Sequence, residues 1–139
     1  MLALTINPES LFQALSDTTR LRIIRLLATT KQEICLCELV DALLEPQYKL
    51  SRHLKALRQA GFLTSQKEGR WVYHKLTTEP DYLKQLYKMV CSLPDTKNIY
   101  RTDLNNFNKR IALRDAGRCR VGILSNELKT GAGNDLPQL

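Results

Sequence analysis

Apolar residues recur at intervals of three and four along the first half of the chain, which is the spacing of amphipathic helices. Side chains that cap or end a helix flank these stretches. We therefore predict four helices: residues 8–15, a second from Ser16 or Asp17 to about residue 30, a third over about 36–44, and a fourth from Pro46 to Gly61.

The period changes after Gly61, where two stretches rich in β-forming residues follow each other. These stretches are residues 62–66 and 71–76. Residues 67–70 between them include Gly69, which can take the positive φ of a tight turn. Helices followed by a hairpin in this order predict a winged helix-turn-helix, a mainly α fold with a small β-hairpin.

Two more helices are predicted in the second half, over residues 81–93 and about 100–115. The first carries more apolar surface than a lone helix needs. We interpret it as the seam of a homodimer, with packing against its own domain as the alternative. The predicted division is a winged-helix DNA-binding and dimerisation domain over 1–95, a helical extension over 96–128 and a disordered tail over 129–139.

The 139-residue chain has a net charge of +7, which favours an anionic partner. Seven basic residues and one acidic residue lie within residues 47–75, so most of the surplus falls on the fourth helix and the hairpin. No apolar run approaches the ~20 residues that span a bilayer, and the N-terminus lacks the features of a secretory signal. We expect a cytoplasmic protein with no membrane partner, whose four cysteines are thiols.

The polar face of the fourth helix is the predicted DNA-reading element. Leu50, Leu54 and Leu57 share its other face, and a basic helix fits the major groove of DNA. An ordinary solvated helix is the alternative, and His53, between the two faces, is at least as compatible with a structural role. The candidate DNA contacts are Gln47, Tyr48, Lys49, Ser51, Arg52 and Lys55, with Arg70 at the hairpin tip reaching a minor groove or a phosphate.

Four segments resemble the ArsR/SmtB family of bacterial metalloregulatory repressors, and in particular its arsenical-resistance branch: LSDTTRLRIIRLL (15–27), EICLCELVDAL (33–43), YKLSRHLKALRQAGFL (48–63) and KEGRWVYHKL (67–76). The resemblance covers about residues 8–95. It implies a homodimer that binds a pseudo-palindromic operator, represses its own resistance operon and dissociates when metal binds. SRHL (51–54) is similar to the family's recognition-helix motif, and Cys35 and Cys37 match its metal box.

Cys35 and Cys37 have the chemistry of a soft-metal site, because thiolates suit As(III) and Sb(III) far better than Mg²⁺ or Ca²⁺. Two positions apart on a regular helix, side chains point ~200° apart. One ion can therefore join both sulfurs only if the backbone at Cys35 is not helical or unwinds. Because the third helix leads into the fourth, that distortion would reposition the reading element. Two buried structural cysteines are the alternative.

The third ligand stays open at this stage. The arsenical metal box often has a third cysteine where Val40 stands here. Cys91, Cys119 or a non-protein ligand such as hydroxide or a small thiol would have to serve. Cys91 lies in the predicted dimer helix, where packing is the simpler role. Cys119 lies between Arg118 and Arg120, which favour its thiolate or serve phosphates.

The sequence thus predicts a repressor of an arsenic-resistance operon, released from double-stranded operator DNA when As(III) or Sb(III) binds as effector, with no catalytic cofactor. A repressor of the same fold that responds to cadmium or lead, or to thiol oxidation, is the alternative. Zinc sensing is disfavoured because His53 and His74 are the only histidines. An enzyme is disfavoured too, because Cys-x-Cys is not the Cys-x-x-Cys of thiol oxidoreductases.

Overall fold

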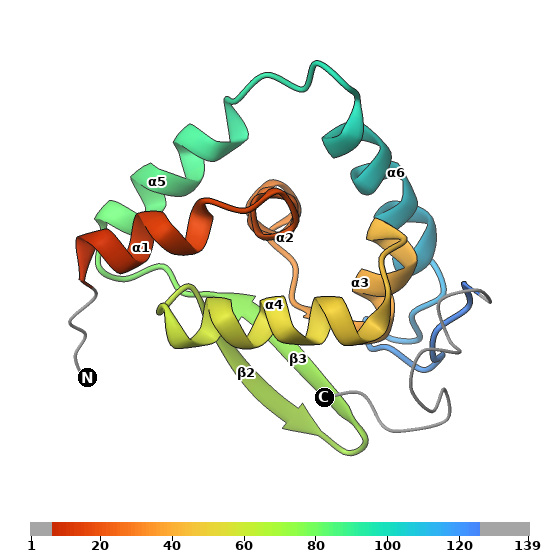
Figure 1. The fold of residues 1–139 in the computed structure, drawn as a ribbon. Coiled ribbons are helices and arrows are strands. Elements are labelled where there is room, and N and C mark those ends of the chain that lie inside the picture. The colour runs from red at the N-terminus through yellow and green to blue at the C-terminus, as the bar shows by residue number, and fades with distance from the viewer. Residues whose placement is uncertain (1–6, 126–139) are drawn as a thin grey trace.

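The computed structural model describes residues 7–125, which form six helices and a three-stranded sheet. In Figure 1 the helices form a ring around α2, seen end-on, and a hairpin extends below α4. Among the described residues, no helix combines the length and the apolar character needed to cross a membrane. The helices are α1 (Pro8–Leu15), α2 (Thr18–Thr30), α3 (Leu36–Leu43), α4 (Gln47–Gln59), α5 (Tyr82–Cys91) and α6 (Ile99–Ile111), and the strands are β1 (Ile34–Cys35), β2 (Leu63–Glu68) and β3 (Trp71–Leu76).

Capping and turn residues set the ends of the first four helices. The Asp17 carboxylate accepts a hydrogen bond from the Arg20 N–H at 3.0 Å and caps α2. Leu44, with φ 57°, turns the chain between α3 and α4. Gly61, with φ 91°, ends the run that contains α4, as glycine does most easily. The four predicted helices are therefore confirmed, with ends displaced by one or two residues.

The predicted hairpin is confirmed, with a shorter connection than expected. Strand β2 continues to Glu68, so only Gly69 and Arg70 separate it from β3. Gly69 has φ 61°, a value that suits a two-residue turn. Phe62, expected to begin the strand, instead lies before it and is fully buried.

Strand β1 was not predicted. It pairs antiparallel with β3, Ile34 opposite His74 and Cys35 opposite Tyr73, and the sheet order is β1-β3-β2. A two-residue strand is too short to give an alternating pattern, so the sequence carries no signal for it. Its consequence is that the backbone at Cys35 is extended, directly before the first turn of α3.

The second-half helix α6 packs along α3 and also contacts α2, with Phe107 fully buried. It ends at Ile111 and not near residue 115 as predicted, and the chain then turns back at Ala116 (φ 54°) and Gly117 (φ 75°). Residues 112–125, here called the C-terminal strap, follow beside α3 and α6 (blue in Figure 1). The predicted domain boundaries stay predictions, and residues 126–139 with the expected tail lie outside the described part.

Helix α5 uses part of its apolar surface against α2, where Leu83 and Val90 are buried. Tyr82 and Met89 are 44% and 51% exposed. Phe12 on α1 is also exposed, at 60%. The alternative reading of α5, packing within its own domain, therefore accounts for one side of the helix. The predicted homodimer remains a prediction for the other side.

Candidate functional site

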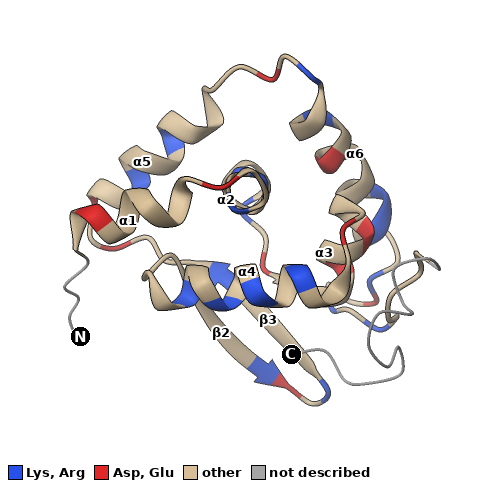
Figure 2. Ribbon diagram, in the orientation of Figure 1, with Lys and Arg blue, Asp and Glu red and all other residues tan. Residues whose placement is uncertain are grey.

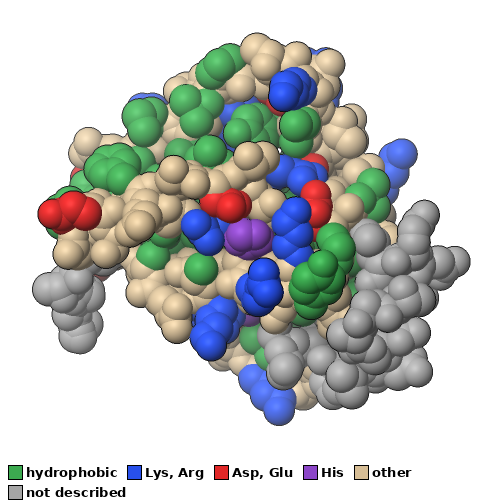
Figure 3. Space-filling view, viewed as in Figure 1, with side chains coloured by type: hydrophobic (Ala, Val, Ile, Leu, Met, Phe, Trp, Pro, Cys, Tyr) green, Lys and Arg blue, Asp and Glu red, His purple; other side chains and the backbone are tan. Residues whose placement is uncertain are grey.

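Helix α4 has one buried and one polar face, as its leucine spacing predicted. Leu50, Leu54 and Leu57 are fully buried against the core. Figure 2 shows basic residues along the rest of α4 and on the hairpin, and Figure 3 shows lysine and arginine side chains gathered over this face. The structure brings the candidate DNA contacts to the surface: Tyr48, Arg52, Lys55 and Arg70 are exposed, and Gln47, Lys49 and Ser51 are half-buried.

Ion pairs fix the corner between α3 and α4. The Lys49 ammonium lies 2.8 Å from Glu45 Oε1, and the other Glu45 oxygen lies 3.1 Å from Arg22 Nη1. Arg22 also donates to Asp103 of α6, at 2.8 and 2.9 Å, and to the Leu43 carbonyl at 2.8 Å. The start of the reading helix is therefore tied to α2 and α6, which gives the C-terminal helix a part in orienting α4.

The hairpin tip adds a second basic point beyond α4. The Arg70 guanidinium lies over the Trp71 ring, 5.0 Å from its centroid. Trp71 itself is buried, so this contact gives the exposed Arg70 side chain a fixed base. The tip also carries Lys67 and the acidic Glu68.

His53 belongs to the support of α4. Its Nδ1 lies 3.4 Å from Arg20 Nη1, and its Nε2 lies 3.9 Å from the Asp17 carboxylate at the start of α2. Burial lowers the pKa of His53 despite the nearby Asp17 carboxylate. Contacts to α2 thus favour the structural reading of this histidine.

Three thiols meet behind the first turn of α3. Cys35, in β1, precedes the helix, Cys37 lies in its first turn, and Cys119 comes from the C-terminal strap; all three are fully buried. The Sγ atoms of Cys37 and Cys119 are 3.4 Å apart. The Sγ atoms of Cys35 and Cys119 and a Glu38 carboxylate oxygen all lie within 4.8 Å of one another. We call Cys35, Cys37 and Cys119 the thiol cluster.

The geometry at Cys35 meets the condition that the sequence imposed. Cys35 has φ −86° and ψ 156°, an extended conformation, and the helix begins after it. The restriction that separates side chains two positions apart on a helix therefore does not apply. The second route, unwinding of a helix at Cys35, is not needed, because that residue is outside the helix already.

Glu38 holds this turn from within. Its Oε1 accepts hydrogen bonds from the Cys35 N–H at 3.0 Å and from Arg114 Nη2 at 2.8 Å, and its Oε2 accepts from Arg114 Nε at 2.8 Å. Both oxygens are thus occupied, and a soft ion prefers sulfur. Glu38 acts as the residue that positions Cys35, through the reciprocal capping bond typical of a helix start.

Hydrogen bonds within the thiol cluster shift the pKa values of its members in opposite directions. The pKa of Cys119 is lowered because the other two thiols donate hydrogen bonds to its thiolate, and the Arg110 guanidinium adds to this. The pKa values of Cys35 and Cys37 are raised by the same hydrogen bonds to Cys119, together with burial. The three groups titrate as a unit in which Cys119 ionises first.

Arg118 and Arg120 are not the source of the charge that favours the Cys119 thiolate, and their alternative role, contact with phosphates, stays a prediction. Arg118 pairs with Glu68 of the wing, and Arg120 is exposed and donates to the Cys119 carbonyl at 3.0 Å. The guanidinium that favours the Cys119 thiolate is that of Arg110, nine positions earlier on α6. Sequence adjacency misidentified the source of positive charge because the Arg118 side chain is engaged by Glu68 and that of Arg120 by a backbone carbonyl, not by the sulfur.

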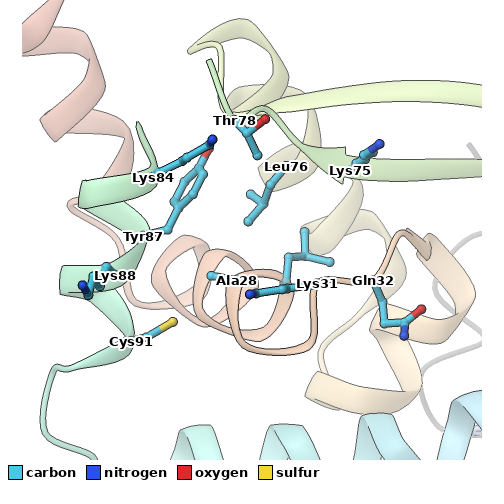
Figure 4. Close-up of a pocket in the computed structure, with 11 residues that line it drawn as sticks. Ala28, Lys31, Gln32, Lys75, Leu76, Thr78, Lys84, Tyr87, Lys88 and Cys91 are labelled. Atoms are coloured by element: carbon cyan, nitrogen blue, oxygen red, sulfur yellow. The ribbon is translucent and has the colours of Figure 1, made fainter. Parts of the chain in front are cut away.

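Cys91 is not part of the thiol cluster. It is half-buried, with its Sγ 3.6 Å from Thr29 Oγ1. It lines a cavity of about 660 Å³ between α2, α5 and the end of β3, together with Leu27, Tyr87 and four lysines (Figure 4). Of the two cysteines left open as a third ligand, the structure brings only Cys119 to Cys35 and Cys37.

Comparison with known proteins agrees with this architecture. The family described as "Bacterial regulatory protein, arsR family" matches residues 17–65, from α2 into β2. Over 85 residues the chain is 41% identical to the arsenic resistance transcriptional regulator ArsR2 of Pseudomonas putida, covering 60% of this chain and 73% of that protein. The chain belongs to the ArsR family. It is a helix-turn-helix transcriptional regulator of the arsenical-resistance branch.

Two further relatives bear on this ArsR-family chain. The arsenical resistance operon repressor of Escherichia coli is 46% identical over 70 residues, 50% of this chain and 59% of that protein. The crystal structure of the transcriptional regulator HlyU from Vibrio vulnificus is 34% identical with a TM-score of 0.54, over 61% of this chain and 84% of that one. These similarities support a winged helix and a repressor. The family match at residues 17–65 includes Cys35 and Cys37 but not Cys119.

Proposed function

We propose that this ArsR-family repressor responds to As(III) or Sb(III) captured by Cys35 and Cys37. The observation that carries the proposal is the thiol cluster itself, three buried sulfurs at the start of α3. Its sulfur-rich composition suits a thiophilic ion. The names of the Pseudomonas and Escherichia relatives refer to arsenic or arsenical resistance, which supports the same class of effector.

In the DNA-bound state, α4 lies in the major groove and the wing lies against the neighbouring backbone. Arg52 is suited to a bidentate bond with guanine, and Lys55 and Tyr48 to phosphates or base edges. Arg70 at the wing tip reaches a phosphate or a minor groove. The remaining contacts are Gln47, Lys49 and Ser51.

We further propose a homodimer, as the resemblance to the family implies. The exposed apolar residues Phe12, Tyr82 and Met89 on α1 and α5 are the surface on which this part of the proposal rests. Two copies related by a two-fold axis would place two α4 helices on half-sites one helical turn, or a multiple of it, apart. The operator is then pseudo-palindromic.

Capture of arsenite is an exchange of ligands without oxidation or reduction. For each thiol that reacts, one As–S bond forms and one As–OH bond breaks, and the thiol proton leaves with the hydroxide as water. The exchange replaces hydrogen bonds between thiols by bonds to arsenic at the base of α3, and α3 joins α4 through residues 44–46. Rearrangement there moves the reading helix relative to the rest of the domain.

The test is fluorescence anisotropy on operator DNA that the protein itself selects from a random duplex library. Saturating arsenite should weaken binding about 5- to 150-fold, the range of ordinary allosteric coupling. The variants Cys35→Ser and Cys37→Ser should bind DNA normally and should stay bound when arsenite is added. Cys91→Ser, outside the thiol cluster, is the matched control and should respond like the wild type. Wild-type binding that is unchanged at saturating arsenite would refute the proposal.

A thiol-redox response is the second candidate, favoured by the 3.4 Å separation of the Cys37 and Cys119 sulfurs. The S–S bond of a disulfide is about 2.05 Å long, so two sulfurs that are already in contact need to move only a short distance to form it. Hydrogen peroxide would accept the two electrons and both thiol protons, leaving two waters and one S–S bond. Release by peroxide in thiol-free buffer with no release by arsenite would select this candidate. Cd²⁺ and Pb²⁺ tested in parallel distinguish the remaining effectors.

A further inference from the structure

The C-terminal strap touches both the thiol cluster and the wing, through two adjacent residues. Cys119 belongs to the cluster, and Arg118 before it contacts the hairpin tip. The family match ends at residue 65, so it assigns nothing to this segment. We infer that Cys119 is the third thiolate of the metalloid site and that Arg118 passes occupancy of the site to the wing. The inference rests on the proposed function and names its ligand set and its route of regulation.

The position of Cys119 suits the valence of the effector. As(III) and Sb(III) form three bonds, and Cys35 and Cys37 supply two sulfurs. The Cys119 sulfur is 3.4 Å from that of Cys37 and lies with that of Cys35 in a group spanning no more than 4.8 Å. All three side chains are fully buried, which excludes water as a competing ligand.

The strap is held in place by the fold, so Cys119 is not a chance neighbour. The Cys119 N–H donates to the Tyr73 hydroxyl at 2.9 Å. Arg110 donates to the carbonyls of Val121 and, at 2.9 Å, Gly122. Beyond them, the Asp41 carboxylate of α3 accepts from the backbone of residues 124 and 125 at 3.0 to 3.1 Å. Contacts on both sides of Cys119 thus fix its sulfur near the other two.

The second half of the inference concerns Arg118. Its Nε donates to Glu68 Oε1 at 3.1 Å, and its Nη2 pairs with Glu68 Oε2. Its guanidinium also lies 3.8 Å from the centroid of the Tyr73 ring. Glu68 is the last residue of β2, and the turn that carries Arg70 follows it. The strap therefore braces the wing tip, in the part of the molecule proposed to meet the DNA backbone.

Bonding to one atom replaces the hydrogen bond between the Cys37 and Cys119 thiols by bonds to the ion, which resets the position of the Cys119 sulfur. Arg118 is the preceding residue and must follow or lose its contact with Glu68. Either outcome changes the position or the charge balance of the wing tip. Occupancy of the site thus reaches DNA through the wing, in addition to the path from α3 to α4.

The ligand half is tested by counting sulfur neighbours of arsenic with X-ray absorption at the arsenic edge, in buffer without small thiols. The wild type should have three sulfurs per arsenic, and so should Cys91→Ser, which removes the other free cysteine. Cys119→Ser should have two sulfurs and one oxygen. A count of two in the wild type, or of three in Cys119→Ser, would overturn the assignment. The wild-type and Cys91→Ser counts do not depend on how well the Cys119 variant folds.

The role of the Arg118–Glu68 contact, here called the brace, is tested by the ratio of the operator Kd with saturating arsenite to that without it. Arg118→Ala should keep three sulfurs per arsenic but reduce this ratio, within the ~2- to 30-fold range by which single residues alter coupling. Arg120→Ala removes a neighbouring arginine whose side chain donates to the Cys119 carbonyl, and its ratio should equal that of the wild type. Glu68→Gln should behave like Arg118→Ala.

The outcomes separate this inference from the proposed function. A wild-type ratio in Arg118→Ala overturns the brace, even if the affinity for free operator has changed. A normal arsenite response in a site of two sulfurs and one oxygen overturns the role of Cys119 and leaves the proposed function standing. Arsenite that neither binds nor releases the wild type overturns the proposed function and this inference with it.

Discussion

Replacing Arg114 with methionine should cost the protein a large share of its stability. Arg114 is the charged partner of Glu38, whose side chain is fully buried at the start of α3. The Arg114 side chain is itself 9% exposed, so water screens the pair little. Methionine fills similar space but leaves the Glu38 carboxylate with only the Cys35 N–H among the bonds described above.

Breaking a buried ion pair by removing one member costs about 3–5 kcal/mol. The free energy of unfolding of a domain of this size is about 5–15 kcal/mol. The loss is therefore a large part of the total at the low end of that range. With a urea m value of about 2 kcal/mol/M, the midpoint of unfolding falls by about 1.5–2.5 M. Circular dichroism in a urea titration measures it, at one protein concentration for all variants because the proposed dimerisation would contribute to stability.

Two variants test the cause of that loss. Glu38→Gln added to Arg114→Met removes the stranded charge and should recover more than half of the lost free energy. Arg101→Met, at an exposed position of α6, should change stability by less than about 0.5 kcal/mol. A loss below about 1 kcal/mol in Arg114→Met, or no recovery in the double variant, would refute the reasoning that this pair holds the start of the C-terminal strap to the base of α3.

Three further predictions concern DNA, pH and assembly. Arg52→Ala should weaken operator binding by about 1–3 kcal/mol, measured by anisotropy, and an unchanged Kd would remove it from the interface. Above about pH 9 the free energy of unfolding should fall as pH rises, because hydrogen bonding within the thiol cluster and burial raise the pKa of Cys35 and Cys37. The unfolded chain then releases protons that the folded chain keeps. Urea titrations at several pH values should show that the free energy of unfolding falls less steeply with pH in the double variant Cys35→Ser/Cys37→Ser than in the wild type. Equal slopes in the two proteins would contradict this prediction. Met89→Glu should convert a dimer to a monomer in sedimentation velocity, whereas Lys88→Glu should not; a Met89→Glu dimer would place the interface elsewhere.

Local signals in the sequence determine most of the reading element. The spacing of Leu50, Leu54 and Leu57 is enough to divide α4 into a buried and a polar face, because helical geometry leaves no other arrangement. Asp17 and Gly61 mark helix ends by chemistry that acts within three or four residues. The hairpin follows from β-forming residues around a glycine. Each of these predictions depends only on near neighbours.

The thiol cluster depends on contacts between distant residues, which a single sequence does not encode in a readable way. Cys37 and Cys119 are 82 positions apart, and nothing near Cys119 identifies its partner. Strand β1 exists because β3 pairs with it, and it decides the conformation at Cys35. Glu38 could have been found, since a Glu three positions after a cap residue is a known helix-start signal. Arg110 and Arg114 could not, because their roles follow from how α6 lies on α3.

Because Cys37 and Cys119 are far apart in the sequence, a metalloid bonded to both sulfurs would also cross-link the chain. One atom bonded to both sulfurs closes a loop of 82 positions, and a cross-link of that span removes about 4–5 kcal/mol of chain entropy from the unfolded state. On the proposed function, the arsenite-loaded protein should thus resist heat and proteases better than the same protein without arsenite, and the gain should be lost when the metalloid leaves.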